Sequence, residues 1–286
     1  MIVSQTVNGL VLGFLYVLIA IGLSIIFGML GIVNFAHGAF FAIGAYLALV
    51  LSREFGWGAA LLAPVIVGAI GVVVEMVLIR HLYGKEPLLG LILTFALALL
   101  VEAVLRLIFG GAPLPFSAPK ALAGFVEYGP ILITKYRLTV LFVTVIALVA
   151  FWLFLEFTAF GRIIRAGSRD AEMVGLLGIN LPIVLSGVFG VGCLLAGLAG
   201  MLAGPLWTVN PSMAGGAIMP AFVIVTIGGL GSYGGAIITG LLVGVVTAMT
   251  IQFYPDWSSA AMYILMALIL LVRPRGLFGE KWERFE

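Results

Sequence analysis

Residues 161–180, GRIIRAGSRDAEMVGLLGIN, form the most highly charged stretch in the middle of the chain. Arg162, Arg165, Arg169, Asp170 and Glu172 fall within eleven positions, between an apolar block that ends at residue 157 and an uncharged block that begins at residue 183. A polar insert between two apolar blocks of spanning length must lie in water on one side of a membrane. Its arginines indicate the cytoplasmic side, because short loops rich in Lys and Arg are retained there. The stretch therefore predicts a membrane protein with a structured cytoplasmic surface.

The composition supports the same class of protein. Hydrophobic residues make up 63% of the chain and charged residues only 9%, against about 25% charged in a typical soluble domain. No charged residue precedes Arg53, and none lies between Glu172 and Asp256. The apolar runs are continuous rather than alternating, which excludes a transmembrane β-barrel. We predict an all-α polytopic membrane protein that forms a single transmembrane domain over residues 1–286.

The apolar blocks predict eight or nine transmembrane helices, some of them short or broken. The predicted spans are residues 7–27, 39–51, 59–79, 88–109, 138–157, 183–206, 217–227, 236–251 and 258–272. The choice between eight and nine depends on residues 213–251, which the glycines of 228–235 interrupt. With nine spans the N-terminus is outside and the C-terminus inside, and basic residues are concentrated in the inner loops, as the positive-inside rule requires. The inner loops then carry Arg80, Lys85, Arg162, Arg165, Arg169, Arg273, Arg275, Lys281 and Arg284, and the outer loops carry Arg53, Lys120, Lys135 and Arg137.

Small residues recur on two of the predicted spans. Gly192, Ala196, Gly200 and Gly204 follow one another at steps of four. Gly9 and Gly13 have the same spacing on the first span. In membranes such rows let helix backbones approach closely. We expect both rows to be helix-packing surfaces.

Catalysis by this chain is not expected. Its two histidines, His37 and His81, form no His-Glu-x-x-His pair, and the chain has no Walker A pattern. Ser232 lacks the first glycine of a Gly-x-Ser-x-Gly elbow, because residue 230 is leucine. We predict no metal site, no catalytic site and no nucleotide site within the chain.

Ionisable residues within spans are functional candidates by default. Glu102 and Arg106 lie four apart on one predicted helix, which favours a local ion pair. Glu75 lies five residues before Arg80, and a packing or interfacial role is favoured for it. The alternative is that Glu75 and Glu102 form the ion site of an ion-coupled carrier or channel. A third possibility is a structural membrane scaffold without a substrate path.

A glycine-broken polar segment, GMLGIVNFAHG, covers residues 28–38. One interpretation is a turn in which Asn34 or His37 caps free backbone groups. The other is a non-helical element that lines a water-filled path, since such backbone is tolerated at membrane depth only there. A second glycine break, GGLGSYGG at 228–235, has a similar pattern. Paired breaks in two halves of a chain can mark a transport path, or they can be alike by chance.

Three motifs carry a resemblance to a known family. Residues 22–48 (GLSIIFGMLGIVNFAHGAFFAIGAYLA), residues 161–180 and residues 228–240 (GGLGSYGGAIITG) resemble the LivH-type permease of branched-chain amino-acid ABC importers. The resemblance covers essentially the whole chain in order, but it does not specify the solute, since similar permeases carry urea, amides or aromatic acids. Met173 and Gly175 depart from the residues expected in the second motif, which puts the choice of partner in question.

The resemblance implies a set of partners and a location. It implies a second homologous permease, two cytoplasmic ATPases that bind ATP and Mg²⁺, a periplasmic binding protein, and a multi-pass location in the bacterial inner membrane. It implies no cofactor in this chain and no nucleic-acid partner. Residues 158–182 would form the coupling loop to the ATPases, with a helix from Arg169 to Leu177 that has an apolar face. The expected coupling residues are Arg162, Arg165, Arg169, Asp170, Glu172, Met173 and Leu177, with Val174 on the same face; the alternative is a solvated connecting loop.

An importer of branched aliphatic amino acids would need a mostly apolar path. Recognition of the amino and carboxyl groups would then fall mainly on the binding protein. The candidate lining residues are Asn34, Phe35, His37, Thr94 and Thr226.

Overall fold

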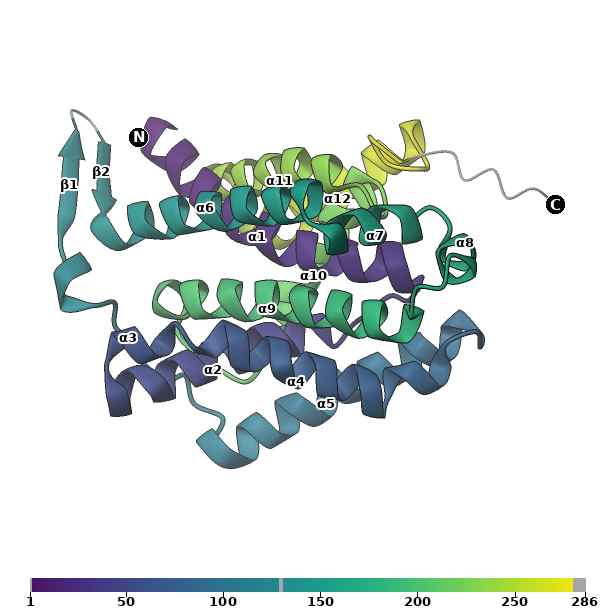
Figure 1. Cartoon of the computed structure of the whole chain (residues 1–286). Coiled ribbons are helices and arrows are strands. Elements are labelled where there is room, and N and C mark those ends of the chain that lie inside the picture. Colours follow the sequence, from purple (N-terminus) through teal and green to yellow (C-terminus); the bar gives the residue numbers. More distant parts are fainter. Residues whose placement is uncertain (1, 129–130, 280–286) are drawn as a thin grey trace.

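The computed structural model describes residues 2–128 and 131–279, so the predicted inner-side residues Lys281 and Arg284 lie outside the described part. The chain is a bundle of helices with one short hairpin (Figure 1). The helices are α1 (Ile2–Leu30), α2 (His37–Phe55), α3 (Trp57–Ala60), α4 (Ala63–Val77), η1 (Ile79–Leu82), α5 (Pro87–Phe109), η2 (Lys120–Leu122), α6 (Lys135–Phe157), α7 (Ala159–Gly167), α8 (Ala171–Leu176), α9 (Leu181–Trp207), α10 (Met213–Gly228), α11 (Tyr233–Phe253), η3 (Pro255–Trp257) and α12 (Ser258–Val272). The strands are β1 (Phe125–Tyr128) and β2 (Ile131–Thr134).

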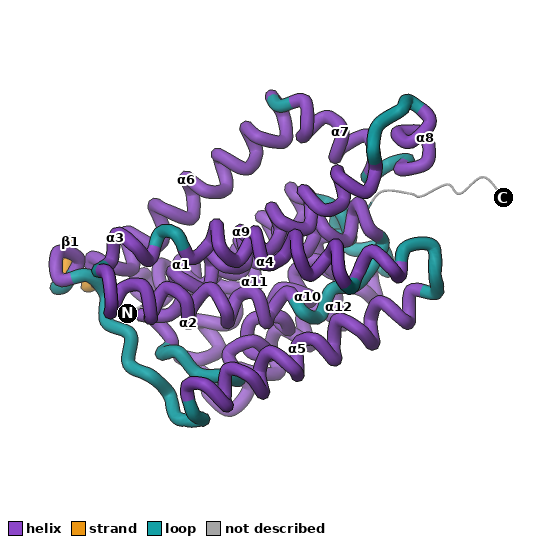
Figure 2. Tube along the Cα trace, turned by 60° about the horizontal axis from the view of Figure 1, so that its bottom comes forward, coloured by secondary structure: helices purple, strands orange, loops and turns teal. Residues whose placement is uncertain are grey.

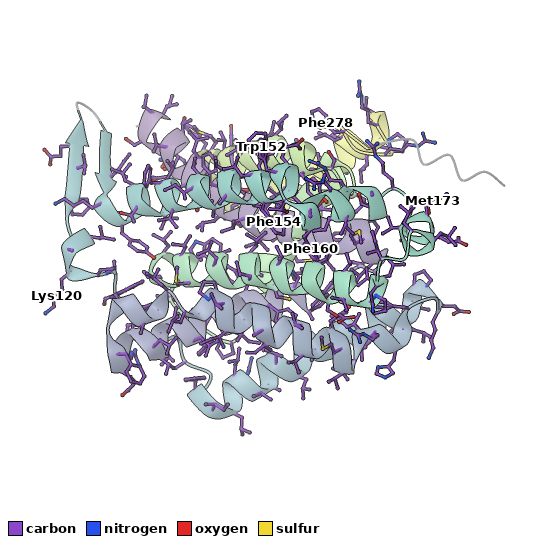
Figure 3. The ribbon with its side chains drawn as sticks, in the orientation of Figure 1. Lys120, Trp152, Phe154, Phe160, Met173 and Phe278 are labelled. Carbon is purple, nitrogen blue, oxygen red and sulfur yellow. The ribbon has the colours of Figure 1, made fainter. Side chains whose placement is uncertain are left out.

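The all-α membrane fold predicted from the sequence is confirmed. Within the described residues, seven helical segments are long and apolar enough to cross a membrane, and α10 and α12 are shorter apolar helices. Ile2 and the end of α12 lie at opposite ends of the bundle (Figure 1), which fits an odd number of crossings and therefore nine rather than eight. Lys120 lies at one end and Met173 and Phe278 at the other (Figure 3). The basic loop 161–180 and the α4–α5 connection share the Met173 end, in keeping with the positive-inside assignment.

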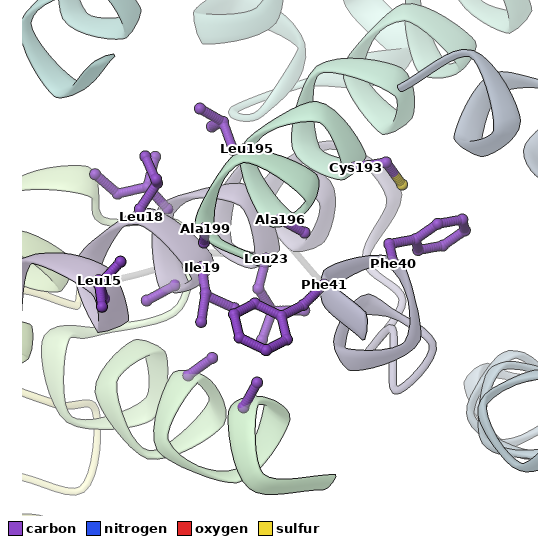
Figure 4. Close-up of a cluster of buried hydrophobic side chains, with 14 of the residues drawn as sticks. Leu15, Leu18, Ile19, Leu23, Phe40, Phe41, Cys193, Leu195, Ala196 and Ala199 are labelled. Atoms are coloured by element: carbon purple, nitrogen blue, oxygen red, sulfur yellow. The ribbon is translucent and has the colours of Figure 1, made fainter. Parts of the chain in front are cut away.

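Helix α1 is the centre of the bundle. Its spanning window is 78% buried, whereas those of α5 and α6 are 17% and 22% buried. The side chains of α1 meet those of α2 and α9 in a tightly packed apolar cluster (Figure 4). Between helices in lipid, close packing replaces the hydrophobic effect as the driving force for association. The apolar faces of α5 and α6 remain exposed, as expected of helices at the lipid boundary.

Small residues set the spacing of the central helices. A Cβ on Gly244 of α11 would lie 2.3 Å from the Gly13 Cα of α1, and a Cβ on Gly200 of α9 would lie 1.9 Å from the Phe41 carbonyl oxygen of α2. The row Gly192, Ala196, Gly200 and Gly204 is buried along α9. Gly192 lies against Ile26 of α1 and Gly204 against the ring of Phe116. The row therefore packs α9 between α1 and α2.

The outer connection at residues 110–136 contains regular structure despite its Pro and Gly content. Strands β1 and β2 form an antiparallel hairpin in which Phe125 pairs with Thr134. Leu114 and Val209 exchange two backbone hydrogen bonds, of 2.7 and 3.1 Å, and join this region to the turn before α10. The hairpin is the only described strand structure, and it stands at one end of the helical bundle (Figure 2).

Candidate functional site

The break between α1 and α2 turns back into the bundle. His37, the first residue of α2, is fully buried, and its Nε2 lies 3.0 Å from the Ile19 carbonyl oxygen. Ile19 is eleven residues before the end of α1 at Leu30, or about 16 Å along the helix axis. Gly31, with φ of 65°, allows the reversal of direction. Helix α2 therefore begins inside the bundle rather than at the end of the bundle where α1 stops.

The polar groups of the break are buried, and only some of them are paired. Thr94 of α5 accepts a hydrogen bond from Phe35 N at 3.2 Å, and its hydroxyl lies 3.2 Å from the Val33 carbonyl oxygen. The Asn34 side chain is 1% exposed, and neither its Oδ1 nor its Nδ2 has a hydrogen-bond partner among the described residues. Ala36 stands at the N-cap of α2 and supplies no side-chain cap. The break is therefore fixed by a side chain of another helix rather than by its own caps.

Aromatic side chains surround this segment. The Phe35 ring stacks on Phe222 of α10 with centroids 6.1 Å apart, and it meets Phe95 of α5 edge-on at 6.2 Å. Thr226 lies one turn after Phe222, and its hydroxyl donates to the Phe222 carbonyl oxygen at 2.7 Å. The structure thus brings together Asn34, Phe35, Thr94 and the Phe222–Thr226 turn.

His37 is placed differently from the other candidate lining residues. It packs in the space that Gly22 leaves on α1, where a Cβ would lie 3.0 Å from the imidazole ring.

Phe95 and Phe222 were not predicted from the sequence as neighbours of Phe35. Their positions in the sequence could have indicated them, because Phe95 directly follows the candidate Thr94 and Phe222 lies one helical turn before the candidate Thr226.

The charged segment of residues 158–182 forms two short helices: α8 lies within the helix predicted from Arg169 to Leu177, and α7 precedes it and was not predicted. Thr158 caps α7 by accepting a hydrogen bond from Gly161 N at 2.9 Å. Asp170 is extended, with φ of −151°, and caps α8 by accepting from Met173 N at 2.8 Å. Arg169 consequently lies in the turn between the helices. Asp170 at the second position of the predicted helix acts as its N-cap, so the helix begins at Ala171.

The apolar face expected on this segment is also divided. Val174 is 3% exposed and faces Gly167 of α7, while Met173 and Leu177 are 54% and 74% exposed. Leu176, which the sequence analysis did not single out, is 76% exposed. Met173, Leu176 and Leu177 therefore form an exposed apolar group on and just after α8, which we call the α8 tip. Figure 3 labels Met173 of this group. Arg162, Asp170 and Glu172 are exposed on the same segment.

The two short helices rest on the ends of the spanning helices nearest to the α8 tip. Gly167 of α7 lies against the Met29 side chain near the end of α1. Gly187 of α9 lies against the Phe160 ring of α7. Arg165 forms an ion pair with Glu156 at the end of α6. A displacement of α7 and α8 would therefore reach α1 immediately before the α1–α2 break.

The two acidic residues considered as ion sites are both paired. Glu102 and Arg106 form the predicted local ion pair on α5, at 3.0 Å. Glu75 is fully buried near the end of α4, and it accepts hydrogen bonds from Tyr83 at 2.7 Å and from Arg80 at 3.2 Å. Burial first, and then the hydrogen bond to Glu75, raise the pKa of Tyr83, so this phenol remains a donor.

Together these features define a polytopic α-helical membrane protein with a buried, aromatic-lined break in its bundle and a structured polar surface at one end. Residues 5–270 match the family described as branched-chain amino acid transport system / permease component, and the chain belongs to this family.

Several known proteins are similar to this chain over nearly its full length. It is 31% identical over 294 residues to the high-affinity branched-chain amino acid transport system permease protein LivH of Escherichia coli K12, covering 96% of this chain and 95% of that protein. It is 32% identical, with the same coverage, to BraD of Pseudomonas aeruginosa, which has the corresponding description. LivM of E. coli, a second permease protein with that description, is 26% identical over 97% of this chain and 71% of its own length. No solved structure matches the chain.

Proposed function

We propose that this chain is the permease subunit of an ATP-driven importer of branched-chain amino acids in the bacterial inner membrane. The observation that carries the proposal is the α8 tip. In water, an exposed group of Met173, Leu176 and Leu177 is a surface that a protein partner would cover. In a family of transport permeases, the partner that must act from the cytoplasmic side is the ATP-hydrolysing subunit.

The break would form the gate of the path. Phe35, Phe95 and Phe222 offer an apolar wall suited to an aliphatic side chain. The uncapped N-terminus of α2 has a partial positive charge inside the bundle. Asn34 adds an amide without a partner among the described residues. A zwitterionic amino acid that passes the gate would meet both an apolar surface and hydrogen-bonding groups there.

Coupling would begin at the α8 tip. ATPases that bind ATP and Mg²⁺ would hold Met173 and Leu177 in a groove, with Arg162, Arg169, Asp170 and Glu172 at its charged rim. Their motion would move α7 and α8 against Met29 at the end of α1. This chain would supply no nucleotide site of its own. A homologous permease, for which LivM of E. coli offers a precedent among the relatives, would form the other half of the path, and a periplasmic binding protein would deliver the substrate.

The first experiment is purification of the tagged chain from native membranes, followed by identification of co-purifying proteins and reconstitution into liposomes. ATP-dependent uptake of leucine, isoleucine and valine, together with recovery of a second permease and P-loop ATPases, is expected. ATP-dependent uptake of urea, amides or aromatic acids in place of these would overturn the substrate assignment. Uptake that needs an ion gradient and no ATP would overturn the importer assignment. The saturated hydrogen bonding of Glu75 speaks against that second outcome.

A paired substitution tests the coupling surface. Leu176→Ser with Leu177→Ser should release the ATPases from the purified complex and abolish ATP-driven uptake, because two exposed apolar anchors are lost. Leu61→Ser with Leu62→Ser is a matched control. These two leucines are also adjacent and exposed, but they lie between α3 and α4 at the opposite end of the bundle. Equal ATPase recovery from the two double variants would contradict the coupling role.

A further inference from the structure

A buried polar cluster joins α4 to α9 outside the gate and outside the coupling surface. Its centre is Glu75, whose side chain is completely inaccessible to solvent. Tyr83 donates to Glu75 Oε1 at 2.7 Å, and Arg80 Nη2 donates to Oε2 at 3.2 Å. Ser186 of α9 also donates to Oε2, and it accepts a hydrogen bond of 2.6 Å from Arg80. Glu75 and Ser186 are 111 positions apart in the sequence.

Separating the ends of α4 and α9 at this cluster would be electrostatically unfavourable. A buried carboxylate is tolerated only when charge-assisted hydrogen bonds replace its lost water. Glu75 obtains these bonds from both sides, from the α4–α5 connection and from α9. If α9 slid away, Ser186 would leave both Glu75 and Arg80 short of a partner. The ends of α4 and α9 are therefore expected to move as one unit.

One side of this unit is attached to the coupling segment. Helix α9 begins at Leu181, directly after the short turn that follows α8, and Ser186 lies on its second turn. Gly175 of α8 lies against Leu181, where a Cβ would come within 3.1 Å of the leucine side chain. A push on α8 is thus delivered to the first turns of α9.

The α4 side of this unit is connected through α5 to the α1–α2 break, the proposed gate. Arg80 and Tyr83 belong to the connection that enters α5 at Pro87. On α5, Gly90 lies against Ile32, and Thr94 bonds Phe35 N and lies within hydrogen-bond distance of the Val33 carbonyl. Two successive turns of α5 therefore hold the α1–α2 break. The cluster is the only described set of side-chain hydrogen bonds between α9 and this connection.

From these contacts we infer that Glu75, Arg80, Tyr83 and Ser186 are positioning residues that transmit movement of the coupling segment, through α9 and α5, to the α1–α2 break. The inference rests on the proposed importer function. It adds a second route to the direct contact of α7 with α1, and it assigns a mechanical role to the Glu75–Arg80 ion pair, which lies outside the proposed gate and the α8 tip.

Ser186→Ala tests the route at the hydrogen bond that joins α9 to Glu75. The change removes the bond between α9 and Glu75 and leaves the Glu75–Arg80 pair in place. In the complex reconstituted into liposomes, ATP hydrolysis should continue while uptake falls, so that the ATP consumed per substrate carried rises about fivefold or more, a typical size for coupling between sites. Ser186→Thr keeps a hydroxyl and should retain coupling. Tyr83→Phe should show an intermediate defect.

Ser24→Ala is the matched control. Ser24 is also a fully buried helix serine, and its hydroxyl has no hydrogen-bond partner among the described residues. Thermal unfolding of each complex separates a coupling defect from loss of fold, because simple destabilisation would lower hydrolysis and uptake together. An unchanged ratio of ATP to substrate in Ser186→Ala, alongside an active wild type, would overturn the inference. A wild type without ATP-driven uptake would instead overturn the proposed function.

Discussion

Two glycine breaks in this chain look alike in sequence and are built differently. Residues 28–31 read GMLG and residues 228–231 read GGLG, and each sequence ends one spanning helix shortly before another begins. They also meet in space, since Gly28 and Gly231 lie against each other. The first break leads into α2 and the second into α11. Their similarity ends with the polar groups that follow the glycines.

The second break is closed by its own serine cap and by the backbone of the segment after α12. Ser232 caps α11 by accepting a hydrogen bond from Gly235 N at 3.1 Å. The segment after α12 adds two backbone bonds, from Leu277 N to the Ile227 carbonyl oxygen at 2.7 Å and from Phe278 N to the Gly228 carbonyl oxygen at 3.2 Å. The first break has no side-chain cap on α2 and depends on Thr94 of α5. A shared glycine pattern thus produces one fixed turn and one turn whose position depends on a neighbouring helix.

The largest expected effect comes from crowding the fixed turn. A Cβ on Gly235 would lie 2.1 Å from the Gly228 carbonyl oxygen, so Gly235→Ala must force the backbones of α10 and α11 apart. We expect a loss of roughly 3 kcal/mol in the free energy of unfolding, seen as a lower Tm of the detergent-solubilised protein and less protein in the membrane. Gly234→Ala is the control, because a Cβ there meets open space among the described residues. Equal stability of the two variants would show that the turn is not tightly closed.

A smaller loss of stability and a larger loss of transport are expected from the first break. Thr94→Val keeps the shape of the side chain but leaves the partly buried Phe35 N–H without its partner, at a cost of about 2 kcal/mol. Uptake should fall by more than the amount of protein in the membrane, because the gate loses the contact that positions it. Thr250→Val provides the comparison, since that hydroxyl bonds only the Val246 carbonyl of its own helix. Normal uptake by Thr94→Val would mean that α5 does not position the break.

The sequence predicted the parts of this architecture that depend on local composition. Long apolar blocks gave the spans, and steps of four between small residues gave the packing row on α9, because both patterns follow from helix geometry and lipid. The break at residues 28–38 was visible as polar and glycine-rich sequence where lipid would not accept it. Eight or nine spans could not be decided in this way, since α10 is only sixteen residues long. Its neighbours, rather than its length, place it in the bundle.

The parts that the sequence did not predict depend on contacts between distant residues or on single caps. Asp170 caps α8, so the expected coupling helix begins at Ala171 rather than Arg169, and a second helix, α7, precedes it. Val174 turns inward because α7 lies beside it, which the apolar pattern alone does not reveal. The antiparallel pairing of β1 with β2, within the Pro- and Gly-rich residues 110–136, was also not predicted. The bond from Ser186 to Glu75 joins positions that no local window contains.

The smallest expected effect distinguishes the two breaks most clearly. Ser232→Ala removes the cap of α11 and should reduce the free energy of unfolding by about 1 kcal/mol. Uptake per folded molecule should remain unchanged, because the Leu277 and Phe278 bonds still hold the turn. Ser212→Ala changes the same residue type at the N-cap of α10, where the serine makes no capping bond, and it should cost less. Reduced uptake by Ser232→Ala at unchanged stability would reverse the comparison, since the second break would then be a moving part of the transport cycle.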